Sequence, residues 1–411
     1  MQQNAYIAGV GMTSFGKHLD RNLKSLAGEA FTDALADAGL NKSAIEAAWV
    51  GNVGAGVISG QVCVPGQIVL RELGLGHIPV VNVENACASS GTAFQQACSM
   101  VSLGGHDVVL ALGIEKLYAE DKQRTFSVFT GGVDVECADE LLGRAQARRT
   151  QMGYDLDAGG AGTTRSLFVD IYADWALTHM ERYGTSLSQL AAVVAKNSQH
   201  GALNPYAQFR GVLSIDDVLA AREILYPLTL PMCSPIGDGA AAVVVVSEQK
   251  ARQLGLSRMV KVEAATLSSG YDYDVASDIA PPQSAANAIY ELAGIGPEEL
   301  DVIELHDASA ISEIMYYEYL GLCGPGAGGE LAASGATGLG GRIPVNTSGG
   351  LMRKGHPVGA TGASQIVELV WQLRGEADRR QVQGASCGLA ENGGGYIGND
   401  VAAITLAILS R

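Results

Sequence analysis

Short apolar runs alternate with amphipathic stretches over most of the chain. Four runs in the first part have the length and composition of buried strands, at residues 6–10, 49–53, 80–83 and 108–112. Between them, residues 23–38 and 92–103 place apolar side chains at the spacing of helices that pack through one face. Strands that alternate with helices usually form a largely parallel sheet with helices on its faces, so the pattern predicts an α/β protein.

The pattern changes between Glu115 and Phe209, where the sequence becomes rich in glycine, charged and aromatic residues. Two amphipathic helices are predicted inside this segment, at residues 166–183 and 188–199. A regular strand returns at residues 241–247, and a second alternating block starts near Val260. We therefore expect three parts: a first half made of residues 1–115 and 210–250, an inserted loop domain at 116–209, and a second half at 251–411.

The two alternating blocks share a faint internal repeat. The first block leads from a strand into Cys87-Ala-Ser-Ser-Gly-Thr-Ala and closes on the run GDGAAAVVVV. The second block leads from NTSGG into His356-Pro-Val-Gly-Ala-Thr-Gly-Ala and closes on GNDVAAITLAI. Two similar halves that face each other would bring Cys87 and His356 together. Chance similarity between Gly- and Ala-rich segments is the alternative explanation.

Length and charge narrow the class of protein. A chain of 411 residues is long enough for more than one domain. Its formal net charge of −16 argues against nucleic acids and anionic membranes as partners, because both are negatively charged. The densest basic stretch, residues 144–149, also contains Ala and Gln and is typical of a solvated helix face.

The 7 cysteines are scattered and include no CxxC pair, so neither a disulfide framework nor a zinc site is predicted. The sequence shows no signal-peptide pattern, no apolar run of membrane-spanning length and no peroxisomal ending, and we expect a cytoplasmic location. A dinucleotide site is disfavoured, because Gly9-Val-Gly is followed by Met-Thr-Ser-Phe-Gly, which lacks the GxGxxG spacing.

Cys87 has the setting of a nucleophile. It follows the predicted strand at residues 80–83 and precedes Ser89-Ser-Gly-Thr-Ala, which places it on the turn into a helix. The free N–H groups and the dipole at a helix start favour a thiolate, and the Cys87 amide is placed to stabilise an oxyanion. An inert buried cysteine is the alternative that the local sequence leaves open.

His356 has a setting suited to proton transfer. It lies among glycines in Gly349-Gly-Leu-Met-Arg-Lys-Gly-His-Pro-Val-Gly, directly before a predicted helix. The proline after it fixes the backbone and suits the first turn of that helix. A histidine held rigidly there can take the thiol proton of a nucleophile and later return it, although a lone histidine more often has a structural role.

His306 and Asp307 end the predicted strand at residues 302–305, at the sheet edge where open α/β folds bind ligands. His306 is placed to donate to a thioester oxygen or to orient a water. Asp307 could cap the following helix, which we expect at residues 308–319. A structural role is again the alternative for His306.

At these places the sequence resembles the thiolase superfamily. NACASSG is similar to the family's nucleophile turn, CSPIGDGAAAVV to the strand that closes the first half, LHDAS to the histidine-aspartate motif, and GGLMRKGHPVGATG to the histidine loop. The order and spacing of these motifs agree over almost the whole chain. The His-Asp form of the third motif resembles the sterol-carrier-protein-type thiolases and their bacterial and archaeal relatives.

This resemblance implies a thiolase fold, in which duplicated βαβαβαββ halves form a five-layered αβαβα core with an inserted loop domain. It also implies a homodimer or homotetramer, coenzyme A thioesters as substrates, and no permanently bound cofactor or metal. Carried over residue by residue, Cys87 would be acylated, His356 would activate it, and His306 would help to polarise the thioester carbonyl. Ser234 would approach the pantetheine arm of coenzyme A.

The sequence departs from the family pattern at the second acid–base group, which thiolases usually supply as a cysteine in a Cys-x-Gly loop or in the His-Asp motif. Here Ala308 and Ser309 follow Asp307, and the loop reads SCGLAENGGG. Aligning the glycines puts Glu391 near the expected cysteine, while Cys387 falls earlier. Three interpretations stay open: Cys387 reaches the site, Glu391 or a histidine replaces it, or the chain does not run the ordinary thiolase reaction.

The combined residues favour reversible acyl transfer, either thiolytic cleavage of 3-oxoacyl-CoA or the reverse Claisen condensation, through an acyl-cysteine intermediate. The alternatives are a related condensing enzyme or acyltransferase on a different acceptor, with or without a small OB-fold partner protein, and a retro-aldolase of the same fold. Retro-aldolase relatives replace the Gly-His-Pro loop by one that bears a tyrosine, so Cys87 and His356 argue against that class. We expect apolar residues of the insertion to line an acyl tunnel next to Cys87.

Overall fold

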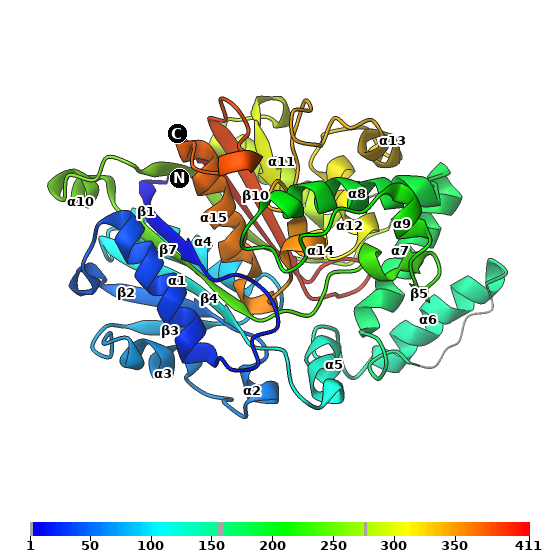
Figure 1. The fold of residues 1–411 in the computed structure, drawn as a ribbon, viewed down its shortest axis with the longest axis horizontal. Helices are drawn as coiled ribbons and strands as arrows, with labels where there is room; N and C mark the ends of the chain where they lie inside the picture. The colour runs from blue at the N-terminus through cyan, green and yellow to red at the C-terminus, as the bar shows by residue number, and fades with distance from the viewer. Residues whose placement is uncertain (1–2, 155–159, 275–277) are drawn as a thin grey trace.

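A large mixed sheet organises the molecule (Figure 1). The computed structural model describes residues 3–154, 160–274 and 278–411. Within them, a 9-stranded sheet has the order β3-β2-β4-β7-β1-β8-β11-β10-β9. Its strands are β1 (Ala5–Met12), β2 (Ala47–Gly51), β3 (Val80–Val83), β4 (Val108–Glu115), β7 (Gly239–Val246), β8 (Val260–Ser269), β9 (Val302–Glu304), β10 (Cys387–Gly394) and β11 (Ala403–Ser410). A separate hairpin pairs β5 (Glu223–Leu225) with β6 (Leu228–Thr229).

The helices lie on both sides of this sheet. Their bounds are α1 (Leu23–Ala38), α2 (Ala55–Ile58), α3 (Pro65–Glu72), α4 (Ser89–Ser102), α5 (Lys122–Thr130), α6 (Ala138–Gln151), α7 (Leu167–Tyr183), α8 (Leu187–Leu203), α9 (Ile215–Leu219), α10 (Glu248–Gln253), α11 (Pro281–Ala293), α12 (Ala310–Tyr319), α13 (Gly328–Ala333), α14 (Gly350–Lys354) and α15 (Thr361–Arg374). Of the short 3-10 turns, η4 (Val358–Ala360) matters for the site, because it joins the histidine loop to α15.

The sheet has two arms of the same design. From the centre outwards, β1-β7-β4-β2-β3 and β8-β11-β10-β9 both begin with antiparallel pairs and end with parallel ones. A parallel bridge from Ile303 to Val345 adds the position that corresponds to β3. The arms meet where β1 pairs antiparallel with β8. The duplication predicted from the faint repeat is therefore present in the strand order.

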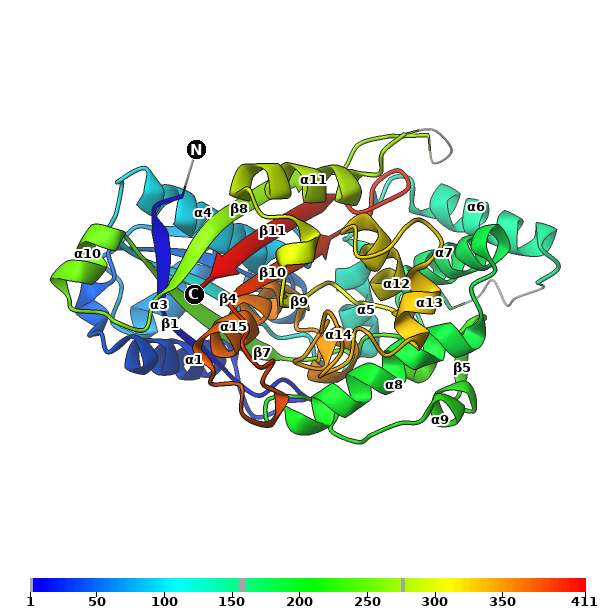
Figure 2. The ribbon, with the colours of Figure 1, turned by 90° about the horizontal axis from the view of Figure 1, so that it is seen from above.

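The helices complete a five-layered αβαβα arrangement, as expected (Figures 1 and 2). Helix α1 packs on the outer face of the first arm through one apolar cluster, and α11 and α12 pack on the outer face of the second arm through another. Between the arms lie α4 and α15, whose apolar residues share a single core with strands of both arms. The predicted α/β class and thiolase-type layering are confirmed.

Small residues allow these layers to approach closely. A Cβ on Gly9 would lie 2.3 Å from the Ala34 carbonyl oxygen of α1, and one on Gly11 would lie 2.4 Å from the Ala30 oxygen. The motif Gly9-Val-Gly therefore packs a helix against a strand. Close packing therefore accounts for these glycines, and a dinucleotide site is not needed to explain them. Helix α1 itself begins at a capping box on Asn22 and ends at Gly39, whose φ of 65° suits glycine.

Two sequence predictions are corrected by the fold. The strand at residues 80–83 was expected to be buried, but β3 is the outer strand of the first arm, and its central residues Val81 and Asn82 are exposed. The helix expected at 308–319 begins at Ala310, because the Ser309 side chain accepts from the Ser312 N–H as its cap. Asp307 has a different function, described below.

The predicted insertion supplies α5, α6, α7 and α8. Helices α7 and α8 lie against α12 of the second arm, whereas α5 lies between α7 and α2 of the first arm (Figure 1). Helix α8 is tied to α12 by polar contacts: Lys196 and Asn197 both bind the buried carboxylate of Glu313, with Asn197 Nδ2 at 2.7 Å from Glu313 Oε2. The division of the chain into residues 1–115 with 210–250, 116–209 and 251–411 stays a prediction. No described helix is long and apolar enough to cross a bilayer.

Candidate active site

Cys87 lies on a tight turn between β3 and α4. Ala86 directly before it has a positive φ of 47°, a conformation that costs a non-glycine residue about 1–2 kcal/mol. Two short hydrogen bonds hold the turn: the Ala86 N–H donates to Glu84 Oε1 at 2.6 Å, and the Ser89 hydroxyl donates to the Ala86 carbonyl at 2.6 Å. The surroundings thus enforce a strained backbone, as is common where a reactive side chain is presented.

The thiol of Cys87 is neutral at rest. Burial raises its pKa to about 12, and the carboxylates of Glu115 and Glu84 act in the same direction. The backbone N–H groups of Cys87 and Gly395 oppose this shift. The N–H groups near the helix start thus act in the direction that the sequence predicted, but burial outweighs them and the resting thiol keeps its proton. Deprotonation needs a base at the moment of attack.

His356 has the position and the tautomer that such a base requires. The Thr361 hydroxyl donates its single proton to the Pro357 carbonyl at 3.0 Å, so at 2.8 Å from His356 Nδ1 it accepts the Nδ1 proton. This leaves Nε2 unprotonated. Burial, followed by His306 and Lys354, holds the pKa of His356 well below its usual range, so the ring is neutral and Nε2 keeps a free lone pair.

His306 has the complementary tautomer. The Asn392 side-chain amide lies 3.0 Å from His306 Nδ1 and donates to it in the observed orientation, so the ring proton lies on Nε2. Burial lowers the pKa of His306 to about 3, which keeps this ring neutral as well. A neutral imidazole with an Nε2 proton can donate to an oxygen that gains negative charge.

The structure brings Cys87, His306 and His356 together. The sulfur and the nearest ring nitrogens lie within 4.8 Å of one another. The two imidazole rings stand at 84°, with centroids 5.1 Å apart. In the described part of the chain this is also the one group whose donor atoms are close enough to hold a metal ion. A metal would occupy the lone pairs that acyl transfer needs, so the two functions would exclude each other.

Cys387 does not join this group, which corrects its predicted placement. It is the first residue of the 8-residue strand β10, whereas Gly394, at the other end, lines the cavity next to Cys87. A strand of that length spans roughly 23 Å. Cys387 instead lies next to Asp301, whose carboxylate accepts a hydrogen bond from the Cys387 N–H at 3.0 Å. The extended backbone of β10 prevents Cys387 from reaching the site.

Glu391 lies much nearer to this group than Cys387 does. Its Oε2 accepts the backbone N–H of His306 at 2.8 Å. A Cβ on Gly393, which lines the cavity, would be 3.5 Å from Glu391 Oε1 and 2.9 Å from the Tyr316 hydroxyl. Burial raises the pKa of Glu391 to about 8, although hydrogen bonds from the His306 backbone and the Tyr316 side chain lower it. Its carboxyl can therefore exchange a proton near neutral pH.

Ser234 lies on the loop before β7, next to the His-Asp motif. Its N–H donates to the Ala308 carbonyl at 2.9 Å, and two residues later Ile236 forms a parallel bridge with His356. This loop therefore connects the segments that carry both histidines. Contact between the Ser234 hydroxyl and a pantetheine arm stays a prediction.

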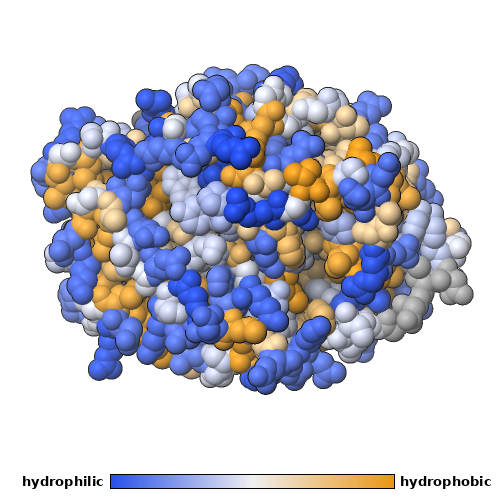
Figure 3. All heavy atoms as spheres, in the orientation of Figure 1, coloured by the Kyte–Doolittle hydropathy of each residue, from blue (hydrophilic) through white to orange (hydrophobic). Residues whose placement is uncertain are grey.

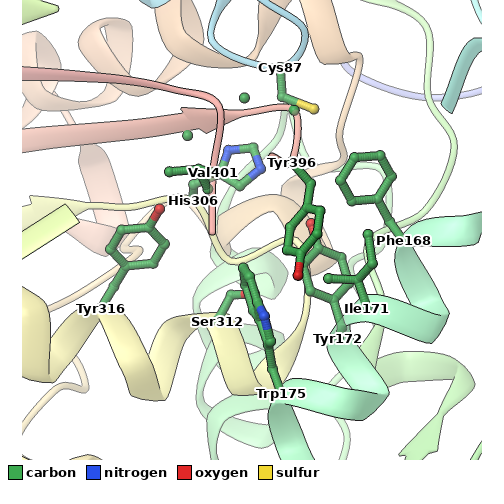
Figure 4. A pocket seen from close by; sticks show the side chains of 13 residues that line it. Cys87, Phe168, Ile171, Tyr172, Trp175, His306, Ser312, Tyr316, Tyr396 and Val401 are labelled. Carbon is green, nitrogen blue, oxygen red and sulfur yellow. The ribbon is translucent and has the colours of Figure 1, made fainter. Parts of the chain in front are cut away.

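Two cavities meet at Cys87. One is lined by 13 residues, five of them aromatic, and α7 of the insertion supplies several of these (Figure 4). The other is the larger of the two and is lined by residues of α2, α5 and the turn before α4, among them Val57, Ser127 and Phe129. Apolar residues of the insertion thus lie close to Cys87, and that they line an acyl tunnel stays a prediction.

Family models match almost the whole chain. The model of the thiolase N-terminal domain covers residues 5–215, and the model of the thiolase C-terminal domain-like family covers residues 264–407. This chain belongs to the thiolase family. It is accordingly a thiolase-type acyltransferase, as the motifs at Cys87, His306 and His356 predicted.

Curated relatives of this thiolase cover nearly all of it. Sterol carrier protein 2 of Oryctolagus cuniculus is 37% identical over 400 residues, which are 94% of this chain and 69% of that protein. Benzoylsuccinyl-CoA thiolase subunit BbsB of Thauera aromatica is 35% identical over 93% of this chain and 92% of its own length. An acetyl-CoA acetyltransferase of Methanothermobacter thermautotrophicus is 35% identical over 95% of this chain and 96% of its own length.

A solved structure described as an Ltp2-ChsH2(DUF35) aldolase has the same fold. It superposes with a TM-score of 0.75 over 99% of this chain and 97% of its own chain, at 24% identity. At 24% identity, this comparison shows a shared fold alone.

Several residues that set up the thiolase site were missed from the sequence. Asn392 and Thr361 fix the two tautomers, and Asp307 fastens the histidine loop by accepting the Leu351 N–H at 2.7 Å and the Asn197 amide at 3.0 Å. Thr361 and Asn392 stand inside the motifs themselves, which was the available signal. Trp175 and its aromatic neighbours carried no signal in the sequence, because their approach to Cys87 depends on how the insertion packs.

Proposed function

We propose that this thiolase moves acyl groups to and from coenzyme A through an acyl-Cys87 intermediate. It cleaves 3-oxoacyl-CoA by thiolysis or runs the reverse Claisen condensation. The observation that carries the proposal is the trio at the meeting point of two cavities: the partly buried thiol of Cys87, the free Nε2 of His356, and the Nε2 proton of His306.

In thiolysis, His356 Nε2 takes the Cys87 proton as the sulfur attacks the 3-oxo carbon. The C2–C3 bond then breaks, its electron pair stays on C2 of the leaving acyl-CoA, and a proton adds there. The thiol of a second coenzyme A then gives its proton to the group that protonated C2 and attacks the Cys87 thioester, and the Cys87 sulfur leaves with a proton returned by His356. Stabilisation of the developing oxyanion comes from the His306 Nε2 proton and from the N–H groups of Cys87 and Gly395, which already point at the sulfur.

Glu391 is our candidate for the group that exchanges the proton at C2. Its support is the carboxyl behind Gly393 at the cavity wall, with a pKa of about 8. The placement of Cys387 at the far end of β10 supports Glu391 over that cysteine. Glu391 therefore replaces the second cysteine that the family pattern leads one to expect.

The two cavities suit the two parts of a thioester: one holds the acyl group and the other admits coenzyme A, with Ser234 assisting the pantetheine arm. Coenzyme A is also the thioester carrier in the printed names of BbsB and of the acetyl-CoA acetyltransferase. No metal or permanently bound cofactor takes part in this scheme.

Oligomerisation through β3 is part of the proposal. This outer strand leaves one edge without a partner strand in the described residues, and Val81 on it is 43% exposed. An exposed edge strand is a ready surface for pairing with a second copy, which supports a homodimer or homotetramer.

A small OB-fold partner also belongs to the proposal, because the relative BbsB is named as a subunit and the aldolase of the same fold is paired with a DUF35 protein. A cytoplasmic location completes it; hydrophilic side chains cover most of the face in Figure 3.

Acylation tests the proposal directly. The wild type and Cys87→Ala are incubated with acetyl-CoA and separately with acetoacetyl-CoA, and intact mass and peptide mapping locate any adduct. We expect one acetyl group on Cys87 of the wild type and none at that peptide in the variant. Turnover of a 3-oxoacyl-CoA that persists in Cys87→Ala would contradict the proposal and favour the retro-aldolase class, which needs no cysteine nucleophile.

A further inference from the structure

Tyr316 and Glu391 approach each other behind Gly393. Glu391 and Gly393 are two residues apart on β10 and therefore share one face of that strand. Tyr316 comes from α12, which packs on this face of the second arm. A Cβ on Gly393 would lie 2.9 Å from the Tyr316 hydroxyl oxygen and 3.5 Å from Glu391 Oε1. Both oxygens thus flank one point of the cavity wall beside Cys87, to which Gly393 and Tyr316 belong.

Neither of these two oxygens has another partner. Both are shielded from solvent, and neither has a hydrogen-bond partner elsewhere in the described residues. The other carboxyl oxygen, Glu391 Oε2, accepts the His306 N–H at 2.8 Å. Figure 4 shows the Tyr316 hydroxyl on the side of its ring that faces His306. Burial raises the pKa of Tyr316 well above its usual range, so the phenol keeps its proton and is the donor of the pair.

A small set of ionisable groups faces Glu391. Among the described residues they are His306 before α12, Tyr316 on α12, Asp400 in the loop before β11, and Tyr172 on α7. Burial keeps His306 neutral and both phenols protonated. The pKa of Asp400 is about 6, so this carboxylate is charged at the pH at which Glu391 titrates. One uncharged donor and one negative charge therefore dominate the surroundings of the Glu391 carboxyl.

We propose that Tyr316 is a positioning residue for the proton transfer at C2: its hydroxyl holds Glu391 Oε1 and stabilises the carboxylate that takes the proton. This inference rests on the proposed role of Glu391. Because the His306 N–H holds Oε2, both oxygens are fixed by one short segment, residues 306–316. A carboxyl held at both oxygens is oriented before the substrate arrives.

Tyr316 and Asp400 act on Glu391 in opposite directions. The Tyr316 hydroxyl favours the carboxylate and lowers the pKa of Glu391, whereas the negative charge of Asp400 raises it. Removing the hydroxyl and neutralising Asp400 should therefore change the proton affinity of Glu391 with opposite signs.

The pH dependence of α-proton exchange tests the inference. The proteins are incubated with acetyl-CoA in D2O at a series of pH values, and mass spectrometry gives the deuterium in the recovered acetyl group. The variants are Tyr316→Phe and Asp400→Asn. Tyr290→Phe is the matched control, because the Tyr290 hydroxyl donates to the Leu320 carbonyl at 2.9 Å and not to Glu391. Phenylalanine at 316 keeps the ring that packs against Tyr319, with centroids 5.9 Å apart. Urea denaturation checks that each variant is folded.

Exchange by the wild type should rise with pH and reach half of its maximum near pH 8, as Glu391 loses its proton. Tyr316→Phe should move this midpoint up by about one pH unit, the order of effect of a hydrogen bond to a charged group. Asp400→Asn should move it down, and Tyr290→Phe should leave it in place. A purely structural role of Tyr316 would lower the rate at every pH without moving the midpoint.

An unchanged or lower midpoint in Tyr316→Phe would overturn the inference and leave the role of Glu391 in place. A shift in the same direction in Tyr316→Phe and Asp400→Asn would overturn it as well. Glu391→Gln in the same assay separates the two levels: exchange at the wild-type rate in that variant would refute Glu391 as the acid–base group, and this inference with it. A wild type that neither exchanges these protons nor acetylates Cys87 would overturn the proposed function itself.

Discussion

Gly91 and Gly362 touch at the point where the helix of Cys87 crosses the helix that follows His356. A Cβ on Gly362 would lie 2.4 Å from the Gly91 backbone nitrogen and 2.8 Å from its Cα. Helices α4 and α15 thus approach at backbone distance in the central layer. Cys87 lies just before α4 and His356 lies in the loop before α15, so this crossing brings the two residues together.

Gly362→Ala should separate the two helices. The added methyl group has no room between backbone atoms, so we expect a loss of about 1–3 kcal/mol in the free energy of unfolding, as for other overpacked cores, together with slower acylation of Cys87. Urea denaturation and intact mass measure the two effects. Gly143→Ala is the matched control, because nothing lies within 4 Å of its Cβ position; it should leave stability equal or higher. An equal loss in both variants would contradict the crossing argument.

Thr361→Val should impair His356 as a base. Valine keeps the shape of threonine but cannot accept the Nδ1 proton, so the tautomer with a free Nε2 is no longer selected. We expect kcat to fall by about 10- to 100-fold, part of what general base catalysis contributes, with KM nearly unchanged. Thr361→Ser retains the hydroxyl and should restore most of the rate. If valine and serine behave alike, the hydroxyl does not set the tautomer.

Glu391→Gln should stop proton exchange at the α-carbon while leaving Cys87 acylation intact. In D2O, the wild type should exchange the methyl protons of acetyl-CoA, and the variant should do so about 10²- to 10⁴-fold more slowly, the usual contribution of a positioned acid–base group. Mass spectrometry of the recovered acetyl-CoA gives the rate. Cys387→Ser is the control and should exchange normally. Loss of exchange in the cysteine variant instead would return the second acid–base function to Cys387.

The same carboxyl should make stability depend on pH. The pKa of Glu391 is about 8 in the folded protein, against an ordinary value of 4.5, so the folded state holds a proton that the unfolded state releases. Its contribution to stability is complete below pH 4.5 and is lost as the pH rises to about 8. Glu115, with a pKa of about 7, acts in the same direction. Thermal unfolding should therefore show that the Tm of Glu391→Gln, relative to the Tm of the wild type, rises between pH 5 and 9. A gap between the two that does not change with pH would rule out this titration.

Asp307→Ala should loosen the histidine loop. The Asp307 carboxylate is fully buried and accepts the Leu351 N–H at 2.7 Å and the Asn197 amide at 3.0 Å, so its removal leaves buried donors without an acceptor. We expect a loss of about 1–3 kcal/mol in the free energy of unfolding and a lower kcat. Chemical denaturation and steady-state kinetics check both. Asp20→Ala, at an exposed position, should change stability by less than about 0.5 kcal/mol.

Much of the fold could be predicted from the sequence because its signals are local. Helix α1 has the bounds that the periodicity predicts, and the turn at Cys87, the loop at His356 and the strand before His306 each follow from a few adjacent residues. Backbone sterics and short-range hydrogen bonds act over that range. The faint repeat between the two blocks also predicted that Cys87 and His356 meet.

The tertiary structure alone decided the properties that depend on distant segments. Burial by both halves sets the pKa of Cys87 to about 12, where the local helix start had suggested a thiolate. The extended run of β10 keeps Cys387 away and brings Glu391 near, although the two differ by only a few positions in sequence. The packing of α7 places Trp175 beside the nucleophile. Desolvation and cavity shape arise from all the segments packed around a point. The sequence therefore determined the candidate groups, and the packing determined their charge, their partners and the cavity walls around them.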